Sequence, residues 1–382
     1  MIFIFLTIAF STFTLAYGVL FAWFRRGWTR LTPTHLDAPE GVHHPFSIIV
    51  AARNEAQNIG DLLHALSEQK YPKKNFEVVV INDSSEDKTE DILKTFGRAN
   101  HSVNFSYHNL SSIKKYGKKA ALTLAIEKSN FPNIISIDAD CLAPPNLLKA
   151  YNSKLSKKPY NFIAGPVAYF KESNFFKRCI DIEFKGLVSI GGASICNQSP
   201  NLCNGANLMF KKSAFYEVNG YEDNMHLASG DDEFLLHKMV TLGVEKIGFL
   251  KSPLAIVYTK GAENFKAFIH QRKRWVSKSR FYSNKKITLL LSLVYLYYLL
   301  ILFGFGCSFI TLHYLWLALG VLLVKTLIEY WYLSSLRFFA FKNLFAHLLA
   351  AQVFYIFYVL GIGALGNWGS FDWKGRTNTS WK

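Results

Sequence analysis

The sequence predicts an α/β domain with a parallel sheet, placed between membrane-spanning helices near the two ends of the chain. Two observations support this fold class. Half of the 382 residues are hydrophobic, and the apolar residues gather near both ends and leave a polar middle. In that middle, short apolar runs of strand type alternate with helical patterns, which is typical of a parallel sheet covered by helices.

The chain begins with an uncharged apolar segment, residues 1–24. As a helix it would reach about 36 Å, against roughly 30 Å of hydrocarbon in a bilayer. A cleaved signal peptide needs basic residues before the apolar run, whereas here Arg25, Arg26 and Arg30 follow it. We predict an uncleaved membrane anchor, and the positive-inside rule places the residues after it in the cytoplasm.

Residues 25–45 have the composition of a linker, with three prolines and three histidines. The histidines are not interpreted as a metal site, because metal ligands need a fixed scaffold. The polar α/β domain is expected at residues 46–282 and on the cytoplasmic side.

Three apolar runs of the middle region are candidate strands. They are residues 47–52, 77–82 and 134–137, and the first two precede helical patterns. Polar residues follow each run, with Asp83 after the second and Asp138 after the third. Open α/β sheets bind ligands outside the carboxyl ends of their strands, so these aspartates are candidate site residues.

A second membrane region is expected at residues 287–366. It holds enough apolar residues for two or three helices, with a break near Gly304 to Gly306 or His313 and a short basic loop around Arg337. Three helices here and one before the domain would place the tail, residues 367–382, outside the cell. The tail is basic, which favours the cytoplasm, so a re-entrant or interfacial segment remains an alternative.

Charge and cysteine content limit the possible partners. Lys and Arg number 43 against 27 Asp and Glu, a net charge of +16. No nucleic-acid motif accompanies this charge, so we expect no nucleic acid partner and ascribe the excess to an anionic membrane face and a diphosphate substrate. Five cysteines without a C-x-x-C pair argue against a disulfide framework or a zinc site.

Asp138 and Asp140 form a D-x-D pair at the end of the third predicted strand. A hard divalent cation binds a few carboxylates together with phosphate oxygens and water, and it neutralises the charge that builds on a diphosphate leaving group. Such a pair is common by chance in loops, and its place at a strand end is what favours a metal site. Asp83 either accepts hydrogen bonds from a base or ribose or caps a turn.

Two further segments carry charged residues with two interpretations each. Gly117-Lys118-Lys119 precedes a helical run, so a lysine there either reaches a phosphate or belongs to a solvated turn. Asp231-Asp232-Glu233 places three acids in a row, which raises pKa values and suits a general base. The same three acids also suit the positive end of a helix dipole, and these two interpretations are compatible.

The segment Gln271-Arg272-Lys273-Arg274-Trp275 lies just before the second membrane region. A cation and an aromatic ring on one helical turn can bind a pyrophosphate and stack on a sugar or base. Lys, Arg and Trp also anchor helices at membrane interfaces, which is the alternative.

In this order, the motifs resemble those of the membrane-bound family-2 glycosyltransferases, the group of the cellulose, chitin and hyaluronan synthases and ceramide glucosyltransferase. Their pattern is D, D-x-D, a later E-D or D-D, and Q-x-x-R-W before membrane helices. The resemblance covers about residues 46 to 282. Thr123 stands where the family's G-K-x-x-A-L-N element has Asn, and Asp231 stands where Glu is commoner.

The resemblance implies a GT-A fold, an inverting displacement, a UDP-sugar donor and a Mg²⁺ or Mn²⁺ ion. The acceptor would be a membrane lipid, a lipid-linked glycan or a growing polysaccharide, and few C-terminal helices favour the lipid. We expect a multi-pass protein of a bacterial inner membrane, with a non-catalytic membrane partner as the alternative from another class.

The resemblance also implies a role for each matching residue. Asp232 would be the catalytic base, with Asp231 beside it, and Asp140 would hold the metal. The residues implied at the donor are Ala52, Arg53, Glu55, Asp83, Lys118 and Asp138. Those implied at the acceptor and pyrophosphate are Asn204, Gly205, Gln271, Arg274 and Trp275.

Overall fold

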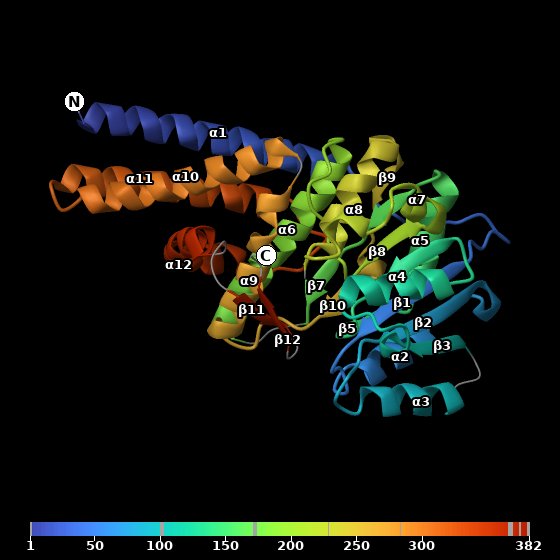
Figure 1. Ribbon diagram of the computed structural model, residues 1–382. Coiled ribbons are helices and arrows are strands. Elements are labelled where there is room, and N and C mark those ends of the chain that lie inside the picture. Colours follow the sequence, from blue (N-terminus) through green and yellow to red (C-terminus); the bar gives the residue numbers. More distant parts are fainter. Residues whose placement is uncertain are drawn as a thin grey trace.

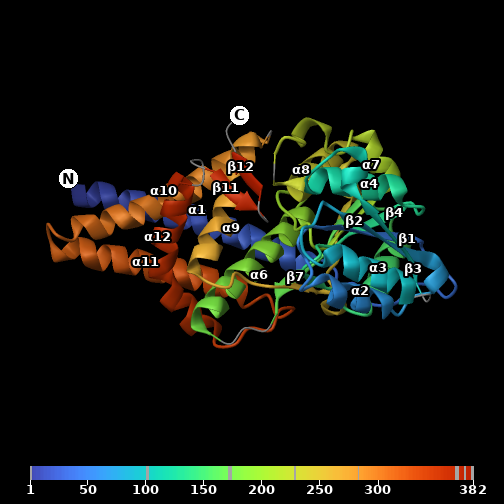
Figure 2. The same cartoon turned by 60° about the horizontal axis from the view of Figure 1, so that its bottom comes forward.

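The computed structural model describes residues 2–99, 103–170, 174–227, 229–282, 284–365, 370–373 and 376–379. Long helices extend to one side of an α/β domain, and helix α6 runs between the two parts (Figure 1). The view in Figure 2 shows the same division, with the sheet and its covering helices opposite the long helices.

The α/β domain is built on a seven-stranded sheet with the order β3-β2-β1-β4-β8-β6-β9. The first four of these strands are parallel, as the sequence predicts, whereas β8 runs antiparallel to both neighbours. The sheet is therefore mixed rather than wholly parallel. Its strands are β1 (Phe46–Ala52), β2 (Phe76–Asn82), β3 (Asn104–Asn109), β4 (Asn133–Ser136), β6 (Phe162–Ala164), β8 (Leu208–Lys211) and β9 (Ile247–Phe249).

The central strands are apolar along their whole length because both faces of the sheet are covered. All seven residues of β2 are buried, as are all but one in β1. The helices of the domain are α2 (Ile59–Ser67), α3 (Thr89–Ala99), α4 (Lys118–Lys128), α5 (Leu147–Lys157), α7 (Lys212–Glu217), α8 (Asp231–Met239) and α9 (Phe265–Ser277). A small sheet of β5 (Cys141–Leu142), β10 (Val257–Thr259) and β7 (Val167–Tyr169) lies beside them.

Within the described residues, four helices are long and apolar enough to cross a membrane. They are α1 (Ile2–Arg30), α10 (Lys285–Cys307), α11 (Leu312–Leu333) and α12 (Leu344–Leu365). Helix α1 continues through Arg30, so the predicted linker is helical over its first six residues. The predicted second region contains three such helices, and the first break lies between Cys307 and Leu312.

The long apolar helices are joined by a buried polar network. Lys325 of α11 donates to Glu329 at 2.6 Å and to Gln352 of α12 at 2.8 Å, and Gln352 donates to Glu329 at 2.8 Å. Tyr17 of α1 donates to the same carboxylate at 2.6 Å. Every charge in the network is thus paired or hydrogen-bonded, as groups in a low-dielectric interior must be.

Helix α6 (Phe175–Cys196) connects the two parts and was not predicted from the sequence. It contacts α1 and α12 on one side and β7 and β9 on the other. In the tail, β11 (Ser370–Trp373) pairs with β12 (Arg376–Thr379), and β11 contacts α9. Lys374, which contributes to the predicted basic character of the tail, lies outside the described residues.

Candidate active site

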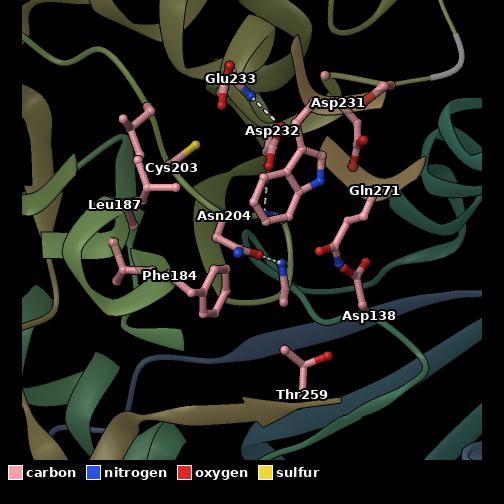
Figure 3. A pocket seen from close by; sticks show the side chains of 18 of the residues that line it. Asp138, Phe184, Leu187, Cys203, Asn204, Asp231, Asp232, Glu233, Thr259 and Gln271 are labelled. Atoms are coloured by element: carbon pink, nitrogen blue, oxygen red, sulfur yellow. Dashed lines mark hydrogen bonds between the residues drawn. The ribbon is translucent and has the colours of Figure 1, made fainter. Parts of the chain in front are cut away.

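A cavity of about 260 Å³ opens at the carboxyl ends of β1 and β4, under α8 and α9. Figure 3 shows Asp138, Asn204, Asp231, Asp232 and Gln271 around one space. The predicted site residues that line the cavity are Glu55, Lys118, Asp138, Asp140, Asn204, Gly205, Asp231, Asp232, Gln271, Arg274 and Trp275.

Lys118 joins two of the acidic motifs of the sequence. Its Nζ lies 2.8 Å from Asp138 Oδ1 and 2.9 Å from Asp231 Oδ2. Burial lowers the pKa of Lys118, but the two carboxylates outweigh this effect and hold the pKa well above its usual value. The pKa of Asp231 is correspondingly lowered, because the Lys118 ammonium outweighs the effect of burial. The Lys118 ammonium therefore bridges one aspartate of the D-x-D motif and one aspartate of the later D-D motif.

Asp140 lies half-buried between β4 and β5 and faces the same cavity. Its pKa is raised by burial and by the negative charge of Asp138. A divalent cation would relieve this repulsion, so the two carboxylates fit one. Among the described residues, no group of three or more His, Cys, Asp or Glu side chains is arranged to hold a metal ion. The donor set thus fits an ion completed by phosphate oxygens and water.

Asp232 is held at the start of α8 by backbone donors. Its Oδ2 accepts the N–H of Gly205 at 2.9 Å, and its Oδ1 accepts the N–H of Glu233 at 2.8 Å. Lys278 Nζ lies 3.6 Å from the same Oδ1. The turn before the helix depends on Gly230, whose φ of +82° favours glycine. These contacts fix the carboxylate in direction while it faces the cavity.

Lys119 holds the loop before α8, a role that neither interpretation of the Gly117-Lys118-Lys119 segment included. Its side chain is 5% exposed, and its Nζ donates to the carbonyls of Asn224, Leu227 and Ser229 at 2.6, 2.9 and 3.2 Å. The loop ends in the acidic residues of the site. Sequence reasoning missed this role because the three acceptors are backbone atoms about 105 residues away along the chain.

Helix α9 carries the Gln271 to Trp275 segment over the cavity. Arg272, a position to which we assigned no role, is buried and pairs with Glu183 of α6 at 2.7 Å. Its guanidinium lies 4.2 Å from the ring centroid of Trp275 and donates to Gln271 Oε1 at 3.2 Å. Arg272 therefore supports two neighbours that line the cavity.

Ala52, Arg53 and Asp83, which were predicted at the donor, are not among the residues lining the cavity. Arg53 donates to the carbonyls of Asp83 and Ser84 at 2.9 and 2.6 Å. The Asp83 carboxylate accepts the N–H of Gly117 at 3.2 Å, and its own N–H donates to the carbonyl of Ala52. These three residues hold the loops after β1 and β2 together, at the edge of the cavity.

The sheet, the strand-end carboxylates and the long apolar helices define a class, the glycosyltransferases of GT-A fold with membrane helices. Comparison with protein families gives the same result. The glycosyl transferase family 2 model matches residues 47–218, and the glycosyl transferase family group 2 model matches residues 133–362. The chain therefore belongs to glycosyltransferase family 2.

Individual relatives are more distant. The probable glycosyltransferase YdaM of Bacillus subtilis is 27% identical over 276 residues, 68% of this chain and 63% of the relative. The poly-beta-1,6-N-acetyl-D-glucosamine synthase of Staphylococcus epidermidis is 25% identical over 181 residues, 47% of this chain and 42% of the relative. The chain thus spans less than two thirds of either protein.

A solved structure with the same architecture is the mannosyltransferase PcManGT of Pyrobaculum calidifontis, in complex with GDP-Man and Mn²⁺. Its TM-score is 0.57 at 16% identity, over 95% of this chain and 97% of that chain. At this identity the likeness shows the fold, and the fold extends over the long helices as well as the sheet.

Proposed function

We propose that this protein transfers a sugar from a UDP-sugar, with inversion, to a membrane lipid or lipid-linked acceptor on the cytoplasmic face of a bacterial inner membrane. The observation that carries the proposal is that Asp138, Asp140, Asp232 and residues of α9 line the same cavity, in a protein with long apolar helices. Carboxylates and a lysine at strand ends suit a nucleoside diphosphate with its cation. The membrane helices bring this cavity within reach of lipids.

Asp232 is the better general base of the two neighbouring aspartates. Asp231 is paired with Lys118 at 2.9 Å, which lowers its pKa and makes it a weaker base. Asp232 is fixed by two backbone N–H groups, and its distance to Lys278 is longer, at 3.6 Å. In this assignment Asp232 orients and deprotonates the acceptor, while Asp231 keeps Lys118 in place.

The proposed reaction is a single displacement. The acceptor oxygen bonds to the anomeric carbon, its proton passes to an Asp232 carboxylate oxygen, and the bond to the diphosphate breaks with its electron pair on UDP. Asp140 and Asp138 would hold Mg²⁺ or Mn²⁺, which stabilises the negative charge of the leaving diphosphate. Lys118 and Arg274 line the cavity and supply positive charge for the same group. Asn204 and Gly205 lie on the acceptor side, and Ala52, Arg53, Glu55 and Asp83 shape the donor side.

A processive polysaccharide synthase is the second candidate, and the similarity to the Staphylococcus epidermidis synthase favours it. Against it stands the wall of the space among the described long helices, because a polymer channel needs a ring of helices around a polar passage. The space among the long helices of this chain is apolar in character, with most of its polar groups paired within the protein.

The experiment uses the full chain in phosphatidylethanolamine and phosphatidylglycerol vesicles, incubated with Mn²⁺ and a panel of radiolabelled UDP-sugars. We expect label from one sugar in the organic extract of the vesicles. Label that stays only in insoluble polymer would exclude the lipid acceptor.

Substitution of the proposed base tests catalysis itself. Asp232→Asn should lower UDP release by about 10³-fold or more, since general base catalysis contributes about 10²–10⁴-fold. Asp223→Asn is the matched control, because Asp223 is 78% exposed and lies outside the cavity. Equal UDP release by wild type and Asp232→Asn would support a non-catalytic protein or another base.

A further inference from the structure

A second cavity, of about 180 Å³, lies among the long helices on the other side of α6. We call it the membrane cavity; α1, α6, α10, α11 and α12 contribute to its wall. Phe184 and Val188 of α6 face the active-site cavity, whereas Gly186 and Ile190 face the membrane cavity. Leu187 lines both. Leu187 is therefore a place on α6 where the two spaces approach each other.

Acidic side chains in the wall of the membrane cavity are already engaged. Glu183 accepts hydrogen bonds from Arg272 at 2.7 Å and from Tyr358 at 2.9 Å. Glu329 accepts from Tyr17 and Lys325, both at 2.6 Å. Their charges are therefore neutralised within the protein and do not attract a polar ligand.

Four of the five tyrosine hydroxyls that line the membrane cavity are engaged as well. Besides Tyr17 and Tyr358, Tyr355 donates to the carbonyl of Cys179 at 3.1 Å, and Tyr332 is 2.8 Å from the Ser189 hydroxyl. The rings and the aliphatic side chains are what remains to contact a ligand. A sugar in this space would lose hydrogen bonds to water without replacing them, which is unfavourable for each group left unsatisfied. A hydrocarbon has no such cost.

We propose that the membrane cavity binds the hydrocarbon chain of the acceptor lipid, whose polar head passes Leu187 to reach Asp232. This inference rests on the proposed lipid acceptor and names where its apolar part is held. An empty apolar cavity of 150 Å³ in another protein binds benzene, so about 180 Å³ holds a short stretch of a single chain. That size fits the single chain of a prenyl lipid and excludes a polymer of sugars.

Photo-crosslinking tests occupancy without requiring transfer. The full chain in vesicles is irradiated with farnesyl phosphate that carries a diazirine at its chain end, and in parallel with a diazirine phosphatidylcholine. Helix α12 supplies matched positions, because Leu348 is 2% exposed and lines the cavity whereas Val353 and Phe357 are 59% and 61% exposed on the outer face.

We expect the prenyl probe to label the cavity positions Leu348 and Val359, and the phosphatidylcholine probe to label Val353 and Phe357. Prenyl labelling confined to the outward positions would overturn the proposal. Equal labelling of Leu348 by both probes would also overturn it, because the cavity would then hold bulk lipid.

A pair of substitutions on the same helix tests function. Val359→Trp fills the membrane cavity, and Val353→Trp places the same side chain on the outer face. We expect Val359→Trp to lower sugar transfer to lipid at least about tenfold with unchanged UDP binding, and Val353→Trp to match wild type.

The outcomes separate the two proposals. Equal lipid product from Val359→Trp and Val353→Trp would overturn the membrane cavity and leave the lipid acceptor intact. A wild type that makes insoluble polymer and no lipid product would overturn both.

Discussion

The Lys119 contact offers a direct test of how the site is held together. We expect Lys119→Met to impair catalysis although Lys119 is not among the residues lining the active-site cavity. The methionine keeps most of the side-chain volume but removes the three N–H donors to the carbonyls of Asn224, Leu227 and Ser229. The loop that leads into Asp231 and Asp232 then loses its anchor.

The size of the effect follows from the three hydrogen bonds. A hydrogen bond to a charged group contributes about 1.5–3 kcal/mol. At the lower value, the two contacts to the buried residues Asn224 and Ser229 contribute about 3 kcal/mol. We count nothing for the contact to Leu227, because Leu227 is only half-buried and water can replace it. If this free energy holds the loop in its competent conformation, its loss lowers kcat/KM by up to about 100-fold.

The assay is UDP release under saturating donor, with hydrogen exchange of residues 220–227 as a second readout. Lys128→Met is the matched control, because Lys128 lies on the same helix and is exposed. We expect a lower kcat and faster exchange in Lys119→Met, with donor KM little changed. A kcat within threefold of wild type together with unchanged exchange would refute the role assigned to Lys119.

Three further predictions follow from the charges of the structure. Burial lowers the pKa of Lys119 to about 8, and the neutral amine has only two N–H donors for three carbonyls. We therefore expect kcat to fall as pH rises through about 8. In a pH–rate profile, Lys119→Arg should lack this fall. Asp140→Ala should abolish the Mn²⁺-dependent part of UDP binding in calorimetry, and affinity that is equal with and without Mn²⁺ in wild type would contradict the metal assignment. Lys325→Met alone should lower thermal stability, because it leaves Glu329 buried without its cation. The double variant Lys325→Met, Glu329→Leu should recover part of that loss, and a double variant less stable than the single one would contradict this account.

Local patterns were sufficient to predict the carboxyl ends of the parallel strands. The runs before Asp83 and Asp138 are apolar because both faces of the sheet are buried, and that requirement is visible in a few consecutive residues. The antiparallel β8 was not predicted, because its four residues, Leu208–Lys211, resemble any short apolar run. Strand direction depends on the path of the connecting chain, which no local pattern records.

Contacts between distant segments were the part that sequence could not supply. The resemblance implied a donor role for Lys118, but no local pattern indicated the partners of Lys118 or of Lys119. In the structure Lys118 joins Asp138 to Asp231, whereas Lys119 turns to backbone carbonyls. The difference is set by the helix, because successive residues of α4 point about 100° apart. A prediction that the helix begins at Lys118 would have indicated that the two lysines point to different partners. It would not have identified those partners.

Arg272 links the active site to the long apolar helices through a chain of side-chain contacts. Its guanidinium contacts the Trp275 ring of α9 and the Glu183 carboxylate of α6, and that carboxylate also accepts from Tyr358 of α12. A displacement of α12 would remove the Tyr358 hydrogen bond from this carboxylate, and a hydrogen bond to a charged group contributes about 1.5–3 kcal/mol. The position of Trp275 over the active-site cavity is therefore coupled to the packing of α12. A chain that ended after α9 would lose this support, and the residues that line the active-site cavity from α9 would lose their fixed positions.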